Sequence, residues 1–215
     1  MAQYFQIHPT HPQLRLIKRA VEIVRHGGVI AYPTDSSYAL GCHIGDKAAM
    51  ERIRRIRRVE EDHNFTLVCR DLSEVAQYAR VGNADYRLLK ANTPGPYTFV
   101  LPATREVPRR LQHPKRKTIG LRVPDHVIAQ ALLAELNEPL MSSTLMLPGE
   151  RQPLSDPEEI RQRLEHDVDL VIDGGFCGLE PTTVIEIEEG RATVVRQGKG
   201  DSERLPHNIA EKSGG

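Results

Sequence analysis

The chain has 215 residues, with 29 lysine and arginine residues against 29 aspartate and glutamate residues, so its formal net charge is zero. Hydrophobic residues make up 39% and charged residues 27%, which is typical of a globular domain and excludes a disordered or low-complexity chain. The zero net charge excludes a polycation that coats nucleic acid. The sequence has no long apolar run and no apolar signal segment, so we expect a cytoplasmic protein without a membrane partner.

Helices and strands are predicted in alternation along the chain. Apolar residues at helical spacing predict a helix over 12–26, and the β-branched segment 29–33 predicts a strand that leads into a hydroxyl-rich turn. Further helices are expected at 46–58, 72–79, 83–91, 126–136 and 156–166, and further strands at 65–69, 97–101, 118–123, 139–143, 169–173, 182–187 and 193–197. This alternation is typical of an α/β protein. Because no linker or repeat divides the chain, we expect one domain over 1–200 and a polar, frayed tail over 201–215.

Cysteines and charge runs limit the kinds of site that the chain can carry. Cys42, Cys69 and Cys177 are odd in number and lack CxxC spacing, which argues against disulfides and a zinc knuckle, so we expect reduced, partly buried thiols. Basic residues concentrate in 52–58 and 105–117. Either run alone is compatible with a solvated surface, but two runs in one domain favour an anion-binding site.

Four loops beside apolar strands offer hydroxyls, guanidinium groups or glycines: YPTDSSYALG, TPGPYTF, RVPDH and DGGFCGLEPTTV. Loops at strand ends are the usual ligand sites of α/β proteins. The chain contains neither GxxxxGK[ST] nor GxGxxG, which argues against P-loop and Rossmann nucleotide sites. A phosphate would therefore be held by arginines and hydroxyls.

Seven ordered blocks between about Leu14 and Gly200 resemble the YrdC-like family of threonylcarbamoyl-AMP synthases, and most closely its YciO branch. The blocks are GGVIAYPTDSSYALG, IRRIRRVEEDHNFTLVC, TPGPYTFVL, TIGLRVPDH, PLMSSTLMLPG, VIDGGFCGLEPTTVIE and VVRQGKGD. The resemblance implies a twisted mixed β-sheet flanked by helices around a large basic concave cavity. It also implies that the cavity binds ATP, L-threonine and bicarbonate, with Mg²⁺ carried by ATP and with no tightly bound metal or organic cofactor.

The same resemblance implies roles for individual residues. Catalytic roles fall to Arg57, at the lysine of the family's K-x-R motif, and to Arg122, whose fork suits the threonine carboxylate. Substrate-binding roles fall to Ser36, Tyr38, His63, Arg122 and Thr182. ATP-binding roles fall to Arg57, Arg58, Thr118, Thr144 and Arg196, and no residue is implied as a metal ligand.

Two positions depart from the family's motifs. Val59 stands at the second basic residue of K-x-R, and Met146 stands at the asparagine of S-x-N. Arg54, Arg55 or Arg58 could supply the missing charge, because residues three or four apart share a helical face. These departures also separate YciO-like proteins from the main synthase group, so they leave the substrate open.

The implied reaction needs positioning and charge neutralisation, and it needs no nucleophilic side chain. Threonine and bicarbonate would form a carbamate that attacks the α-phosphate of ATP and expels pyrophosphate. A separate transferase complex would then use the adenylate to modify an adenosine of tRNA. Two alternatives stay open: a non-catalytic binder of double-stranded or structured RNA that uses Arg52 to Arg58 and Lys115 to Lys117, and a carbamoyl- or acyl-adenylate enzyme with another substrate.

Overall fold

The computed structural model describes residues 1–59, 63–204 and 210–211. Its helices are α1 (Leu14–Arg25), α2 (Lys47–Arg57), α3 (Leu72–Tyr78), α4 (Asn83–Asn92), α5 (Val127–Leu136) and α6 (Pro157–Leu164), with 3₁₀ turns η1 (Arg109–Leu111) and η2 (Ser202–Arg204). Its strands are β1 (Gln3–Gln6), β2 (Ile30–Tyr32), β3 (Ala39–His43), β4 (Thr66–Val68), β5 (Tyr97–Pro102), β6 (Thr118–Arg122), β7 (Leu140–Thr144), β8 (Leu170–Asp173), β9 (Thr183–Glu188), β10 (Arg191–Arg196) and β11 (Ala210–Glu211). None of the described helices has the length and apolar character that crossing a membrane requires.

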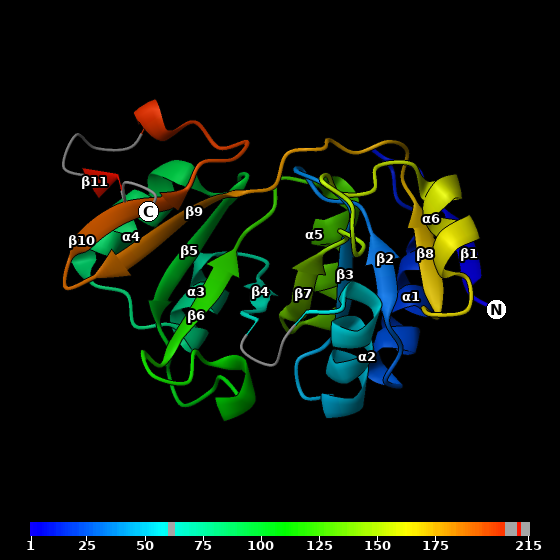
Figure 1. Ribbon diagram of the computed structural model, residues 1–215, viewed down its shortest axis with the longest axis horizontal. Coiled ribbons are helices and arrows are strands. Elements are labelled where there is room, and N and C mark those ends of the chain that lie inside the picture. The colour runs from blue at the N-terminus through cyan, green and yellow to red at the C-terminus, as the bar shows by residue number, and fades with distance from the viewer. Residues whose placement is uncertain (60–62, 205–209, 212–215) are drawn as a thin grey trace.

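The described strands form one open sheet in the order β1-β8-β2-β3-β7-β4-β6-β5-β9-β10-β11. Its pairings are mixed: β4 runs parallel to β6 and antiparallel to β7, and β5 runs parallel to β9 and antiparallel to β6. The sheet twists along its length, so that the β5–β6–β9–β10 half and the β2–β3–β7–β8 half present different faces in Figure 1. The twisted mixed sheet with flanking helices that the sequence predicted is therefore confirmed.

All the predicted helices and strands are present with small shifts at their ends, and three short strands were not predicted. One of them, β3, contains Gly41, which reads as part of a turn in the sequence. In the fold a Cβ at Gly41 would lie 2.8 Å from the Tyr32 ring, so glycine is required there for β2 and β3 to pair closely. Another, β11, lies within the tail expected to fray and pairs with β10. The tail residues 205–209 and 212–215 lie outside the described residues.

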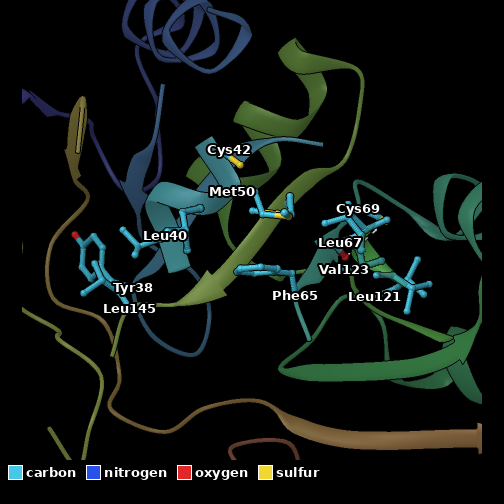
Figure 2. Packing of buried hydrophobic residues seen from close by; sticks show 14 of the residues in the cluster. Tyr38, Leu40, Cys42, Met50, Phe65, Leu67, Cys69, Leu121, Val123 and Leu145 are labelled. Atoms are coloured by element: carbon cyan, nitrogen blue, oxygen red, sulfur yellow. Dashed lines mark hydrogen bonds between the residues drawn. The ribbon is translucent and has the colours of Figure 1, made fainter. Parts of the chain in front are cut away.

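Two buried clusters cover opposite faces of the sheet. Residues of α2, α3, α4 and α6 belong to the first cluster, and residues of α1 and α5 belong to the second. Figure 2 shows part of the first cluster, in which Met50 of α2 packs beside Leu40 and Phe65. Helices α1 and α5 cover only part of the sheet face on which the second cluster lies. The uncovered part of this face forms the floor of a cavity.

Side chains alternate between core and cavity on the strands of this floor. On β4, Leu67 belongs to the buried cluster, while Thr66 and Val68 line the cavity. On β6, Leu121 is buried, while Gly120 and its neighbours two residues away line the cavity. Successive residues of a strand point to opposite faces of the sheet. Apolar residues at one set of alternate positions therefore face the core, and the polar residues between them face the cavity.

Helix α2 positions one wall of the cavity. Asp46 caps its first turn by accepting a hydrogen bond from the Ala49 backbone N–H at 2.8 Å. Met50 and Ile53 are buried against the sheet and fix the rotation of the helix about its axis. The last helical residue is Arg57, which the helix thereby directs toward the cavity.

Candidate functional site

The cavity has a volume of about 510 Å³ and extends over β4, β5, β6 and β9. Several residues to which the sequence assigned roles line it together: Arg57, His63, Thr118, Arg122, Thr144, Thr182 and Arg196. They come from segments that are far apart in the sequence, and the sheet order brings them together. The predicted basic cavity is thus present as a concave site that carries several arginines.

Arg122 lies at the end of β6 in a buried ion pair. Its Nη2 donates to a carboxylate oxygen of Asp35, and its Nη1 donates to Ser36 Oγ at 3.2 Å. The Arg122 and Asp35 side chains are only 9% and 10% exposed, respectively. The Arg122 Nε has no hydrogen-bond partner among the described residues, although it is buried. One donor of this buried guanidinium is therefore unsatisfied within the described part of the chain.

Ser36 and Tyr38 stand in the same turn but in different surroundings. Ser36 is 1% exposed and lies beneath Arg122, so its hydroxyl helps to orient that guanidinium. Tyr38 points into the core beside Leu145 (Figure 2), and its hydroxyl donates to the Gly175 carbonyl at 2.8 Å. The structure therefore places Tyr38 outside the cavity lining, where it fixes the loop after β8.

Arg57 is held in the cavity by three contacts. Its Nη1 donates to Ser143 Oγ and lies 2.9 Å from His63 Nε2, and its Nε donates to the Met146 carbonyl at 3.4 Å. Burial and the positive charge of Arg196 lower the pKa of the Arg57 guanidinium. Thus two guanidinium groups repel each other across one cavity.

Arg196 approaches the cavity from the end of β10. Its Nη2 donates to the Thr182 carbonyl at 2.8 Å, and the Thr182 hydroxyl lies 2.7 Å from the Thr98 hydroxyl. Partial burial of the guanidinium lowers the pKa of Arg196, although the residue as a whole lies at the exposed rim. Among the described residues, no carboxylate forms an ion pair with Arg57 or Arg196. Two such cations in one cavity favour an anionic ligand.

Arg58 and the two departing positions do not share this placement. Arg58 follows Arg57 directly, but it lines a separate depression on the outer side of α2 and is not among the cavity residues. Met146 lines the cavity beside Arg57. Val59 is half-buried and is not among the residues that line the cavity. The chain therefore lacks the family's second basic residue at this position, but the Val59 side chain does not make the cavity itself more apolar.

The sequence did not single out several residues that complete the site. Asp35 pairs with Arg122, and the Lys199 ammonium donates to the Asp35 carbonyl. Arg116 and Glu186 face the cavity as an ion pair. Asp35 lies within the hydroxyl-rich turn and Arg116 lies within the second basic run. The sequence therefore indicated both segments as parts of a site, but it did not identify these two residues. Among the described residues, no group of three or more histidines, cysteines, aspartates or glutamates is placed to hold a metal ion.

Comparison with known proteins shows close relatives over nearly the whole chain. A family model described as "Telomere recombination", of the Sua5/YciO/YrdC type, matches residues 22–198. The uncharacterized protein YciO of Escherichia coli is 62% identical over 201 residues, which cover 94% of this chain and 98% of that protein. The crystal structure of E. coli YciO, aligned over 95% of this chain and all of that one, gives a TM-score of 0.92 at 61% identity.

More distant relatives carry functional names. The threonylcarbamoyl-AMP synthase of Chromobacterium violaceum is 35% identical over 185 residues, which cover 85% of this chain and 94% of the relative. The crystal structure of P. abyssi Sua5 complexed with L-threonine has a TM-score of 0.89 at 23% identity, over 97% of this chain and 62% of that one. This last likeness supports the fold alone. The matched family model and the identities above 30% show that this chain belongs to the Sua5/YciO/YrdC family.

Proposed function

We propose that the chain makes L-threonylcarbamoyladenylate and pyrophosphate from L-threonine, bicarbonate and ATP. The observation that carries this proposal is the pair Arg57 and Arg196, two partly buried cations in one cavity without a carboxylate partner among the described residues. Two like charges in one cavity repel each other, and a polyphosphate supplies the missing negative charge. The relatives named threonylcarbamoyl-AMP synthase support the same reaction.

The part of the cavity that Arg122 lines suits a small carboxylate. Asp35 and Ser36 fix the Arg122 guanidinium through its two terminal nitrogens, and the buried Nε has no hydrogen-bond partner among the described residues. A guanidinium whose position is already fixed loses little side-chain entropy when an anion binds. We assign the amino-acid carboxylate to Arg122 and the phosphates to Arg57 and Arg196, and the P. abyssi Sua5 complex with L-threonine supports an amino-acid ligand in this fold.

In this proposal the side chains position the reactants and neutralise charge. The threonine nitrogen bonds to the carbon of bicarbonate with loss of water, and a carbamate oxygen then attacks the α-phosphorus of ATP. The bond to the bridging oxygen of the β-phosphate breaks, and pyrophosphate leaves with its electron pair. Arg57 and Arg196 would stabilise the negative charge that builds up on the phosphates, while the hydroxyls of Thr118 and Thr144 face the same cavity.

Mg²⁺ enters this proposal as an ion that arrives with ATP. The carboxylate that lines the cavity among the described residues is Glu186, which is engaged with Arg116. The described lining thus offers arginines and hydroxyls rather than free carboxylates, and the ATP oxygens would hold most of the ion. We further propose that the protein acts in the cytoplasm and that a separate transferase complex passes the threonylcarbamoyl group from the adenylate to an adenosine of tRNA, which releases AMP.

The proposal is tested by pyrophosphate release with each substrate omitted in turn. We expect release only when threonine, bicarbonate and ATP are all present, and we expect a loss of about 10²-fold in Arg57→Ala and Arg196→Ala. Arg87→Ala is the matched control, because this exposed arginine on α4 does not line the cavity. Release that needs ATP and another carboxylic acid, but not threonine, would assign the site to a different adenylate.

A further inference from the structure

An ion pair between Arg116 and Glu186 lines one side of the cavity, and the reaction proposed above gives it no role. Glu186 lies on β9, and Arg116 lies in the turn two residues before β6. Strand β5 separates β6 from β9 in the sheet (Figure 1), so the ion pair reaches across β5. The Glu186 side chain is only 13% exposed. A nearly buried carboxylate therefore borders the space that a ligand would fill.

The strand register shows where Glu186 lies relative to Arg122. Glu186 pairs with Val100, and Val100 pairs with Gly120, so these three residues form one row across β9, β5 and β6. All three line the cavity. Arg122, to which the amino-acid carboxylate is assigned, lies on β6 two residues beyond Gly120. With strands about 4.8 Å apart and a rise of about 3.3 Å per residue, the Cα atoms of Arg122 and Glu186 are roughly 12 Å apart.

This separation matches the length of the proposed product. In threonylcarbamoyl-AMP, about ten covalent bonds separate the carboxylate carbon from the 3′-oxygen of the ribose, and they span roughly 12 Å when extended. Gly120 lies in the row of Glu186 and on the strand of Arg122, and it raises no side chain from the floor between them. A product whose carboxylate lies at Arg122 can therefore place its ribose beside Glu186.

The chemistry of the ion pair suits sugar hydroxyls. A carboxylate only accepts hydrogen bonds, and its two oxygens offer about four lone-pair sites, so Glu186 can accept from Arg116 and from hydroxyl donors at the same time. An acidic residue accepts the ribose 2′-hydroxyl in dinucleotide-binding folds for the same reason. Arg116 also neutralises the carboxylate, which would otherwise repel the phosphates of a nucleotide. Val100 and Val184 add the apolar surface that a nucleoside requires beside Glu186.

We propose that Glu186 accepts hydrogen bonds from the ribose hydroxyls of the bound nucleotide, and that Arg116 holds the Glu186 carboxylate in place for them. Glu186 is thereby a specificity-determining residue that selects ribonucleotides over deoxyribonucleotides, and Arg116 is a positioning residue. This inference rests on the proposed function, because it requires a nucleotide in the cavity.

The test measures the affinity of the full chain for ATP, 2′-deoxy-ATP and tripolyphosphate by isothermal titration calorimetry. We expect the wild-type protein to bind ATP about tenfold more tightly than 2′-deoxy-ATP, because the deoxy sugar lacks one hydrogen bond to a charged group. Glu186→Met combined with Arg116→Met removes both charges, so it should bind the two nucleotides equally and leave the affinity for tripolyphosphate unchanged. Arg116→Lys keeps a cation beside Glu186 and should retain the preference for ATP.

The matched control removes an ion pair outside the cavity. Arg163→Met combined with Glu150→Met breaks an exposed pair with a distance of 2.8 Å and should keep the wild-type preference for ATP. An unchanged preference in the Glu186/Arg116 variant would overturn the inference. Equal affinities of the wild-type protein for ATP and 2′-deoxy-ATP would also overturn it, and this comparison does not depend on the folding of any variant.

The same nucleotides separate this inference from the function on which it rests. Pyrophosphate release by the wild-type protein at equal kcat/KM with ATP and 2′-deoxy-ATP would refute the ribose site and leave the proposed function intact. Failure of the wild-type protein to bind either ATP or tripolyphosphate would refute both.

Discussion

The buried ion pair of Arg122 and Asp35 gives the sharpest prediction about stability. Both side chains are about one-tenth exposed, and Asp35 Oδ2 also accepts the Asp125 N–H at 3.0 Å. Arg122→Met removes the cation and leaves the Asp35 carboxylate buried with a single neutral donor. Removal of one partner of such a pair costs about 3–5 kcal/mol. For a chain of this length the Tm should fall by roughly 6–20 °C, at about 2–4 °C per kcal/mol.

The matched variant separates the structural role from the binding role. Asp35→Asn combined with Arg122→Met removes both charges, so we expect it to recover about 2–3 kcal/mol of the lost free energy of unfolding. Urea unfolding followed by circular dichroism measures the free energy of unfolding of both variants and of the wild-type protein. The recovered double variant should still fail to use threonine, because the carboxylate-binding guanidinium is gone. A cost below about 1 kcal/mol for Arg122→Met would show that solvent screens the pair and would refute this reasoning.

Three further predictions address the cavity and the thiols. Met146→Asn places a polar group beside Arg57 and should raise kcat/KM for ATP by up to about tenfold, the value of one neutral hydrogen bond, in steady-state pyrophosphate assays. Gly178→Ala sets a Cβ 2.7 Å from the Ser36 carbonyl, so the loop must shift and KM for threonine should rise by up to about 10²-fold while KM for ATP stays constant. Burial raises the pKa of Cys177 to about 11, so this thiol is protonated at neutral pH, and its labelling by Ellman's reagent should accelerate steadily as the pH rises toward that value.

The sequence predicted the fold well because strand and helix periods are local signals. Segments such as 97–101 and 118–123 alternate or run apolar between turn residues, and both became strands with ends shifted by at most a residue or so. The strand β3 was missed because Gly41 reads as a turn residue, whereas its real role is to let the Tyr32 ring approach from the neighbouring strand.

The candidate site was harder to predict, since it depends on the rotation of helices and on contacts between distant residues. Arg57 and Arg58 are adjacent in a basic run, and neighbouring helical residues point about 100° apart, so the run alone does not show which of them faces the cavity. The contact of Arg122 with Asp35 joins residues that are 87 positions apart. Tyr38 likewise reads as a turn residue, but burial of its ring against Leu145 turns it toward the core.

The most direct test of the central claim is the mass of the product made with ¹³C-bicarbonate. The protein would be incubated with ATP, L-threonine and the labelled bicarbonate, and the nucleotide products separated and weighed by mass spectrometry. We expect the wild-type protein to make threonylcarbamoyl-AMP that carries the carbon-13 label, and we expect the Arg57→Ala, Arg196→Ala double variant to make little of it. An adenylate without the label, or equal amounts of labelled product in both proteins, would contradict the central claim.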